Sequence, residues 1–239
     1  MTVITQLQES GCILKFVQKE VDPKIPTYWS RHIWVFESDE QAKIQIHFYK
    51  QQQNGRDVLF CMMPIGQVDA LAGVPSFHSG ITNDEVAIEA LIPSQNPLYQ
   101  RPPDIKRLSG IQDFEANPDS ILLNPITLHA PIKKLGENGA IKVIEEDDNH
   151  VILEIDLKKS LLKIDDDTYS DVNVDTGMDH RPFNATDGQH RKIACQLDEK
   201  ACNMNVIVVL APLGTTAAQA AEIFTDSNVQ QEPLKELHM

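Results

Sequence analysis

The feature that most constrains the fold is the close alternation of strand and helix patterns in the last third of the chain. Residues 181–185 have the pattern of a short strand, a tight turn follows at 186–188, and a helical pattern covers residues 189–200. The apolar run 204–211 predicts a buried strand, and Thr216 is placed to cap a further helix. Strands and helices at such short spacing predict an α+β fold with a compact mixed sheet and flanking helices.

The N-terminal part, residues 1–62, is expected to be rich in β-structure. Apolar residues alternate or cluster there in segments of strand length, which is the pattern of strands rather than helices. These segments are residues 12–17, 32–36, 43–49 and 57–63. The polar run 51–55, which ends in Asn-Gly, predicts a turn between the last two.

The next section, residues 63–136, is expected to contain helices and one buried strand. The predicted helices cover 67–72, 83–91 and 105–114, and the predicted strand covers 120–128. Gly73 is expected to end the first helix and Asn83 to cap the second. Apolar residues spaced three apart give the third helix one face that points inward.

Residues 137–182 are predicted to form an acidic hairpin and loop. Two apolar segments, 142–146 and 151–157, flank the polar turn 147–150. Residues 163–182 are acidic and poor in apolar side chains, so we expect an exposed loop there.

The four sections are expected to form one domain. A length of 239 residues fits a single good-sized domain. We therefore treat residues 1–239 as one unit, whose last section, 183–239, carries the motif discussed below.

The net charge of −14 bears on which partners the chain can bind. A protein that grips nucleic acid along its backbone usually shows a basic field, because each neutralised phosphate needs a lysine or arginine. Residues 137–175 contain 12 carboxylates against 4 lysines, a local net charge of −8. Extensive DNA binding by this chain alone is therefore disfavoured, although the remainder has room for a local basic patch.

The sequence predicts a cytoplasmic protein without a membrane span. No apolar run approaches the ~18–20 residues that cross a bilayer, and the first residues lack the pattern of a signal peptide. The cysteines are scattered and form no Cys-x-x-Cys pair, so we expect reduced and mostly buried thiols rather than a zinc ribbon. They are Cys12, Cys61, Cys195 and Cys202.

The segment Asp187-Gly188-Gln189-His190-Arg191 has the chemistry of a small anion cradle. Gly188 permits a tight turn with a positive φ, and the amides of the helix that follows are donors for an anion. The Arg191 guanidinium can donate hydrogen bonds to two phosphate oxygens at once, and His190 adds a further donor. Asp187 has three alternative roles: capping the helix, holding His190 or Arg191, or orienting Mg²⁺. An Asp-Gly turn followed by solvated first-turn residues is the competing interpretation.

This pentapeptide, followed by Ala194, resembles the signature of the DGQHR-domain family. That family includes DndB-like proteins associated with DNA phosphorothioation and modification, and it resembles the ParB/sulfiredoxin fold. The further matching segments are 99–131, 205–210, 221–228 and, more weakly, 58–74. The resemblance implies a nucleotide site, with ATP or another nucleoside triphosphate and Mg²⁺ as cofactors.

The resemblance also implies which residues form the site. The expected nucleotide-binding residues are Gly188, Gln189, His190, Arg191, Arg101, Arg107 and Asn228. The expected catalytic residues are Asp187, Gln189 and Arg191, with Asp187 as the metal ligand. Solvated arginines at 101 and 107, and an asparagine that merely closes a helix at 228, are the alternatives.

Two positions separate this chain from its implied relatives. Sulfiredoxins have a nucleophilic cysteine where Gln189 stands, and an amide cannot replace a thiolate, so sulfinic-acid reduction is rejected. Thr186 stands where the family usually has an apolar residue, which weakens the predicted strand. An acidic insertion also precedes the motif, and the family's further helical region does not follow Met239 in this sequence.

The residues themselves predict anion binding. The resemblance extends this to Mg-dependent binding and hydrolysis of a purine nucleotide, within or beside a DNA-modification or phage-defence system. The alternative is a non-catalytic regulator, transcriptional or of assembly, that binds nucleotide or DNA. A nicking nuclease is a third class, and no metal-carboxylate cluster supports it. Expected partners are other DNA-modification or defence proteins, DNA only together with them, and a homo-oligomer is left open. His180, beside Asp179, is either a general base or a loop histidine.

Overall fold

The computed structural model describes residues 11–22, 25–74, 123–173, 179–194 and 199–229, together with a few residues in 8–9 and 110–121. Side chains are described over most of these ranges, but not over 13–31. The predicted helix at 83–91 and both arginines predicted for the site, Arg101 and Arg107, lie outside the described residues.

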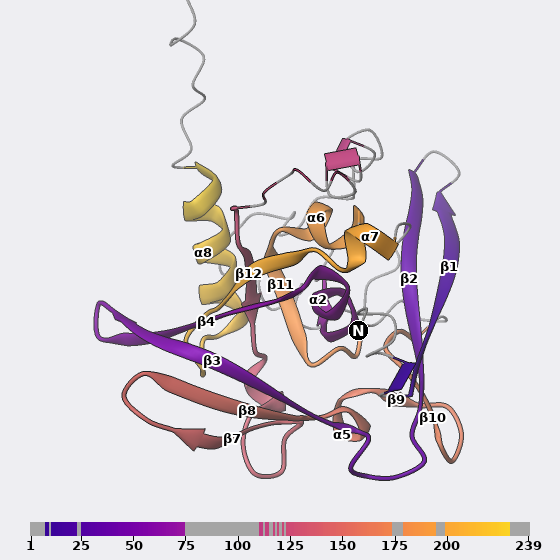
Figure 1. Cartoon of the computed structure of the whole chain (residues 1–239), viewed down its shortest axis with the longest axis horizontal. Helices are drawn as coiled ribbons and strands as arrows, with labels where there is room; N and C mark the ends of the chain where they lie inside the picture. Colours follow the sequence, from indigo (N-terminus) through magenta and orange to yellow (C-terminus); the bar gives the residue numbers. More distant parts are fainter. Residues whose placement is uncertain are drawn as a thin grey trace, which may run out of the picture.

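The described part of the chain is an α+β fold with more strand than helix (Figure 1). Its strands are β1 (Cys12–Asp22), β2 (Ile25–Val35), β3 (Lys43–Gln53), β4 (Arg56–Pro64), β5 (Ala72–Gly73), β6 (Ile126–His129), β7 (Ile141–Glu146), β8 (His150–Asp156), β9 (Leu162–Lys163), β10 (Thr168–Ser170), β11 (Phe183–Asp187) and β12 (Asn205–Leu210). Its helices are α2 (Ile65–Leu71), α5 (Leu157–Ser160), α6 (Gln189–Ala194), α7 (Glu199–Cys202) and α8 (Ala217–Val229), with a 3-10 turn at Ile132–Lys134.

The strands form two sheets. The larger has eight strands in the order β5-β11-β6-β12-β4-β3-β8-β7, and the smaller has four in the order β1-β2-β10-β9. The β11–β5 and β12–β6 pairs are parallel and the other pairs of the large sheet are antiparallel, so this sheet is mixed. The predicted α+β class with a mixed sheet is thus confirmed.

The β3–β4 hairpin shows how the sequence sets the large sheet. Asn54 and Gly55 both have positive φ, at 50° and 75°, and Gln53 pairs with Arg56 across them. Asn-Gly is the usual sequence of a two-residue hairpin loop whose twist matches that of the strands. The loop fixes the register, and alternate residues of both strands then point into the core.

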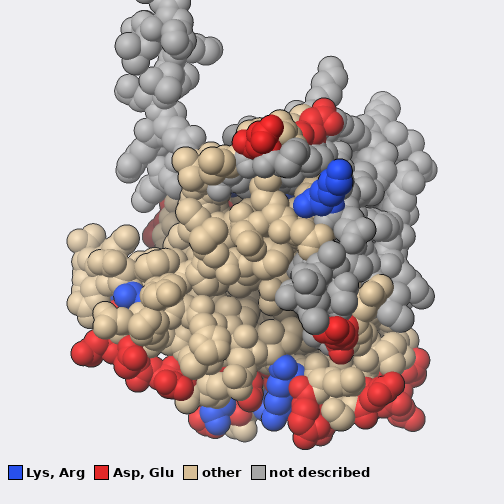
Figure 2. All heavy atoms as spheres, in the orientation of Figure 1, with Lys and Arg blue, Asp and Glu red and all other residues tan. Residues whose placement is uncertain are grey.

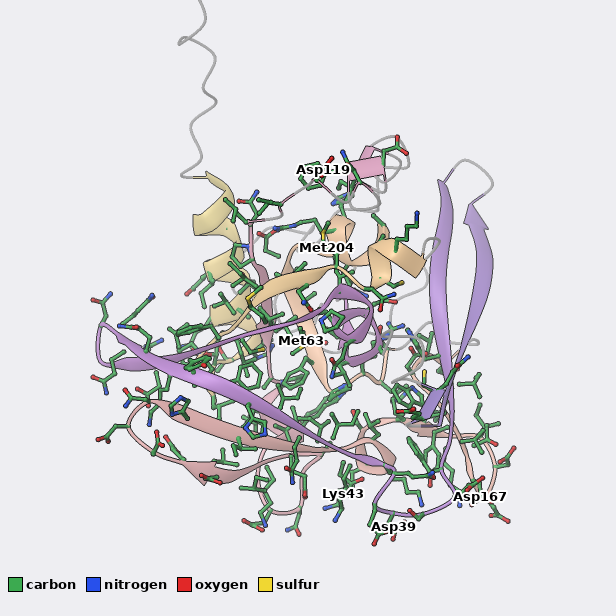
Figure 3. The ribbon with its side chains drawn as sticks, viewed as in Figure 1. Asp39, Lys43, Met63, Asp119, Asp167 and Met204 are labelled. Atoms are coloured by element: carbon green, nitrogen blue, oxygen red, sulfur yellow. The ribbon has the colours of Figure 1, made fainter. Side chains whose placement is uncertain are left out.

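The core lies against the inner face of the large sheet and extends to the end of the small one. Trp34 and Phe36, both fully buried, stack with ring centroids 5.9 Å apart. Figure 3 shows Met63 within the fold, whereas Asp39, Lys43 and Asp167 lie at its periphery. The expectation of reduced, buried cysteines holds for Cys12, Cys61 and Cys202, which are free and buried.

Three sequence expectations are wrong in the described residues. The segment 163–182 is not an exposed loop throughout, because it contributes β10, and both Asp171 and Arg181 are buried. The buried strand expected at 120–128 exists only as β6; before it, Ile121 is 74% exposed and Leu123 is 72% exposed. Phe114, expected on an inward helix face, is 40% exposed. Apolar spacing alone does not show whether another element covers a face.

Other predicted elements appear with shifted ends. Helix α2 ends at Leu71, and Gly73 belongs to the short strand β5 rather than to a helix cap. Thr216 caps α8 as expected, since its Oγ1 accepts a hydrogen bond from the Gln219 backbone amide at 3.2 Å. Among the described residues, no helix is long and apolar enough to cross a membrane.

Candidate functional site

The motif turn, residues 187–191, joins strand β11 to helix α6. Strand β11 has a bulge at Thr186, because Ala185 pairs with Leu128 while Asp187 pairs with Thr127, the next residue. The bulged Thr186 is buried and donates its hydroxyl to the Thr127 carbonyl at 3.1 Å. A threonine here therefore does not prevent the strand; its hydroxyl bonds to the backbone beside the bulge.

Gly188 supplies the turn that the sequence predicts. Its φ is +88°, and a Cβ on it would lie 2.9 Å from the Ile126 side chain and 3.2 Å from a guanidinium nitrogen of Arg191. Both facts require glycine. The Lys192 amide donates to the Gly188 carbonyl at 3.0 Å, which makes Gly188 the N-cap of α6.

Arg191 folds back over this turn. Its Nη1 donates to the Asn124 carbonyl at 2.6 Å, while its Nη2 lies 3.4 Å from Asp187 Oδ2. The first contact is short and fixes the guanidinium. The second is long, and the Asp187 side chain is 42% exposed. The arginine is therefore oriented by a backbone carbonyl and only loosely held by the carboxylate.

The remaining predicted site residues fall into two groups. Gln189 is buried at 6% exposure and His190 is half-buried, both on α6 beside the turn. Asn228 lies on α8, which packs against β11, but its side chain is not among those described. The structure thus brings together Asp187, Gly188 and Arg191 in one partly buried turn.

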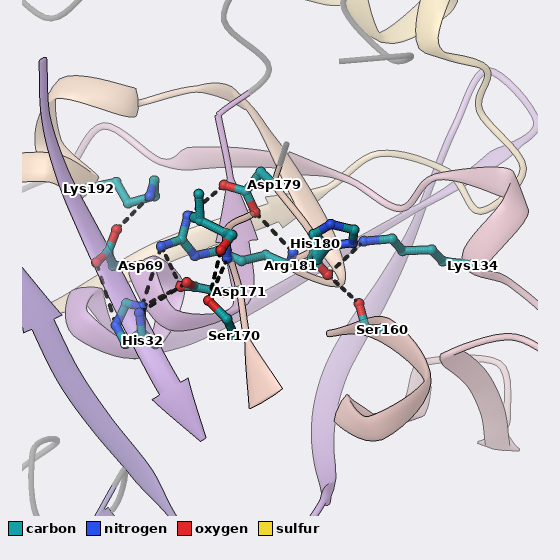
Figure 4. A network of polar contacts seen from close by, with 11 residues as sticks. His32, Asp69, Lys134, Ser160, Ser170, Asp171, Asp179, His180, Arg181 and Lys192 are labelled. Atoms are coloured by element: carbon teal, nitrogen blue, oxygen red, sulfur yellow. Dashed lines mark hydrogen bonds and ion pairs between the residues drawn. The ribbon is translucent and has the colours of Figure 1, made fainter. Parts of the chain in front are cut away.

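The residue after the motif leads into a buried charge network that the sequence did not reveal (Figure 4). Lys192 is 2% exposed, and its Nζ donates to Asp69 Oδ1 of α2 at 2.5 Å. The other oxygen of Asp69 lies 3.8 Å from Nε2 of His32, on β2. This ion pair attaches the motif helix α6 to α2.

The network continues from His32 into the small sheet and back to the large one. His32 Nδ1 lies 2.7 Å from Asp171 Oδ2, and Oδ1 of the same carboxylate accepts a hydrogen bond from the His32 backbone amide at 3.0 Å. Arg181 bridges two carboxylates, with Nη2 at 2.6 Å from Asp171 and Nη1 at 2.6 Å from Asp179. Acidic and basic side chains alternate along this chain of contacts. The buried charge network is defined as His32, Asp69, Asp171, Asp179, Arg181 and Lys192.

Electrostatics within this network favours the charged forms of Asp69 and Arg181. Burial alone would raise the pKa of the Asp69 carboxyl, but the charges of Lys192, Arg181 and His32 outweigh it and hold that pKa well below its usual range. Burial likewise opposes the Arg181 charge, and the carboxylates of Asp171 and Asp179 overcome it, so the pKa of Arg181 is raised. Burial raises the pKa of the nearby Cys12 thiol, with Asp171 adding to the effect, so that cysteine is a neutral core residue.

His180, the histidine considered above as a general base, and its neighbour Asp179 have separate surroundings. The Asp179 carboxylate holds Arg181 and lies against Gly73, where a Cβ would come within 2.5 Å of its Cγ. His180 is half-buried, and burial followed by the charge of Lys134 lowers its pKa. Its carbonyl accepts from Ser160 Oγ at 2.7 Å and from Lys134 Nζ at 3.0 Å. Asp179 thus has a structural partner.

A magnesium ion at the motif turn would have one protein ligand, Asp187. The described residues contain no group of three or more His, Cys, Asp or Glu side chains that could hold a metal alone. Mg²⁺ commonly binds through one or two carboxylates together with substrate phosphates and water. The one partly exposed carboxylate of this turn, Asp187, fits that mode of a metal–nucleotide complex.

Two signals in the sequence point to the buried charge network, though neither is decisive. Lys192 follows Arg191 directly, on the side of a short helix that faces away from solvent. Asp171 and Arg181 lie within the acidic segment 163–182, which has too few apolar residues to form a core of its own. Comparisons with known proteins identify no relative: no protein-family model, curated protein or solved structure matches this chain.

Proposed function

We propose that the motif turn binds the phosphates of a nucleoside triphosphate, as its Mg²⁺ complex. The observation that carries the proposal is the position of Arg191. The Asn124 carbonyl orients its guanidinium over the turn, and Gly188, which has no Cβ, lets that guanidinium lie close to the backbone amides. A phosphate oxygen would replace the loose Asp187 contact on the guanidinium, a charge-assisted exchange that needs no backbone movement. Asp187, released, would face the metal.

Hydrolysis is the enzymatic form of this proposal. The residues that would carry it are Asp187, as the group that positions water and metal, and Arg191, as the group that stabilises charge on the transferred phosphoryl. Mg²⁺ would supply Lewis-acid charge stabilisation. The setting beside a DNA-modification or phage-defence system rests on the resemblance of residues 187–191 to the DGQHR-domain family.

The second candidate is a regulator that binds nucleotide without turning it over. The observation that favours it is the burial of Gln189, which at 6% exposure presents little of its amide to a water molecule. In this case the nucleotide would act as a signal, and binding would bias how α6 and its neighbours meet a partner protein.

Calorimetric titration of the full chain with MgATP tests the shared part of both candidates. We expect binding of MgATP and none of adenosine, because the proposed contacts are to phosphates. Adenosine binding as strong as that of MgATP would contradict a phosphate site. A phosphate-release assay with MgATP then separates the two candidates: turnover supports the enzyme, and tight binding without turnover supports the regulator.

A further inference from the structure

The outer face of the large sheet carries an uncharged surface built from two rows of side chains. In the first row, His150, Tyr49 and Phe60 lie on adjacent strands, since Tyr49 pairs with both of the others. Phe60 in turn pairs with Val209 of β12. The second row runs parallel, with His47 opposite Ile152 and Met62 opposite Ile207. We call this surface the aromatic face; it is defined by His47, Tyr49, Phe60, Met62, His150 and Ile207.

Three large apolar or aromatic side chains of the aromatic face are exposed to solvent. Met62 is 68% exposed, Tyr49 is 56% exposed and Phe60 is 37% exposed. The rings of Tyr49 and Phe60 stack at 5.6 Å, and Tyr49 contacts His150 with ring centroids 5.0 Å apart. Single exposed apolar residues are ordinary, but a contiguous group of aromatics and methionine is typical of a protein interface.

Most charges around the aromatic face are acidic, although strand alternation puts Lys43, Arg56 and Lys142 on the same side of the sheet. Neither row contains a lysine or an arginine. The β7–β8 hairpin lies at one end of the rows and carries four exposed carboxylates. Glu146 pairs with Lys50 at 2.9 Å. The other three, Glu145, Asp147 and Asp148, we call the acidic rim. Figure 2 shows a broad surface over β12, β4 and β3 that is mostly without charged side chains, with carboxylates and a few lysines or arginines along its lower edge.

We propose that the aromatic face is a docking surface for a basic amphipathic segment of a partner protein. Apolar side chains of that segment would cover Tyr49, Phe60 and Met62, and its lysines or arginines would meet the acidic rim. The same charges argue against the other occupants. Single-stranded nucleic acid needs cations beside its stacking rings. A second copy of this chain carries the same net charge of −14, so charge repulsion opposes its approach. The inference is independent of the motif turn.

The test measures binding of a labelled synthetic amphipathic peptide of leucine and lysine to the full chain, by fluorescence anisotropy. We expect the double substitution Tyr49→Ser and Met62→Ser to weaken binding about tenfold or more, the effect of losing interface anchors. The matched control substitutes Ile132 and Ile164, which are 51% and 49% exposed elsewhere, and should change affinity less than about twofold. Equal losses in both variants would overturn the proposal.

Reversing the rim charge gives a second variant that leaves the strands intact. The substitutions Glu145→Lys and Asp148→Lys should weaken binding of the leucine–lysine peptide and reduce its dependence on salt. A leucine–glutamate peptide should not bind the unmodified chain. The proposal is also overturned if oligothymidylate binds more tightly than the basic peptide, or if sedimentation shows a dimer that Tyr49→Ser with Met62→Ser dissociates.

Discussion

The motif turn and the buried charge network each contain an aspartate–arginine pair, but the two pairs differ in how far they are buried. In the turn, Asp187 and Arg191 lie 3.4 Å apart, with 42% and 15% of their side chains exposed. In the network, Asp171 and Arg181 lie 2.6 Å apart, with 0% and 5% exposed. An exposed pair contributes little to stability and is easily exchanged for a ligand, whereas a buried pair cannot lose one partner cheaply. The partly exposed turn is therefore the better candidate for the proposed ligand binding, and the buried network holds α6, α2 and β2 together.

The largest expected effect is on the buried side of this comparison. Asp171→Ala would leave Arg181 and His32 in the interior without their shared carboxylate. We expect the free energy of unfolding to fall by about 3–5 kcal/mol, measured by urea denaturation. Asp166→Ala, at a fully exposed carboxylate, is the control and should change stability by less than ~0.5 kcal/mol. A loss as small as that of the control would mean that the network is not buried as described.

Acid should act on the same network through Asp69. Its pKa is held below the usual range, mainly by Lys192 once burial is overcome, so its contribution is present above the unfolded pKa of about 4 and is lost as pH falls further. We expect roughly 2–3 kcal/mol of stability to depend on this group. The double variant Asp69→Leu with Lys192→Met should flatten the profile of unfolding free energy below about pH 4. An unchanged slope would show that other carboxylates dominate acid unfolding.

On the exposed side, Arg191→Ala should separate ligand binding from stability. We expect affinity for MgATP to fall by about 1.5–3 kcal/mol, the range for hydrogen bonds to a charged group. The free energy of unfolding should change by less than ~1 kcal/mol, because the side chain crosses the surface of the turn. Calorimetric titration and urea denaturation of the same preparation measure the two quantities. The control is Arg56→Ala on the β3–β4 hairpin, and equal affinity of both variants would remove Arg191 from the site.

The smallest expected effect on binding comes from Gln189, which lies between the two regions. Gln189→Ala keeps the backbone amide, so affinity for MgATP should fall by no more than ~1 kcal/mol. If the amide positions the attacking water, the rate of phosphate release should fall further than affinity, because misplacing a reactant costs rate more than binding. Steady-state turnover and equilibrium binding of one variant decide the matter. Equal losses in both would show that Gln189 only holds the nucleotide.

The parts of this protein that local physics specifies could be predicted from its sequence. The alternation in β3, β4 and β8, the turn at Gly188 and the cap at Thr216 each depend on a few neighbouring residues. The buried charge network could not be predicted this way. Its partners Asp69 and Lys192 are 123 residues apart in the chain, and His32 and Asp171 are 139 apart. A charged residue is expected to be exposed when only the sequence is known, because the partner that allows its burial is distant in the chain.

The same limit applies to apolar side chains. Ile121 and Leu123 look like a buried strand because their own composition is apolar, yet both are exposed. The aromatic face presents the reverse case, since the alternation in β3 correctly places Tyr49 opposite the core but cannot say that no element of the described chain covers it. Burial depends on which elements pack together, and that is set by the topology of the sheet.

The position of β12 has a consequence for the order in which the chain can fold during synthesis. This strand lies in the middle of the large sheet, between β6 and β4, although it is the last strand in sequence. Until residue 210 has left the ribosome, β4 and β6 each have an open edge, which is a template for wrong pairing. We expect nascent chains that stop before residue 205 to be cleaved readily by protease and to need chaperones, and chains that include β12 and α8 to become resistant together, in one step.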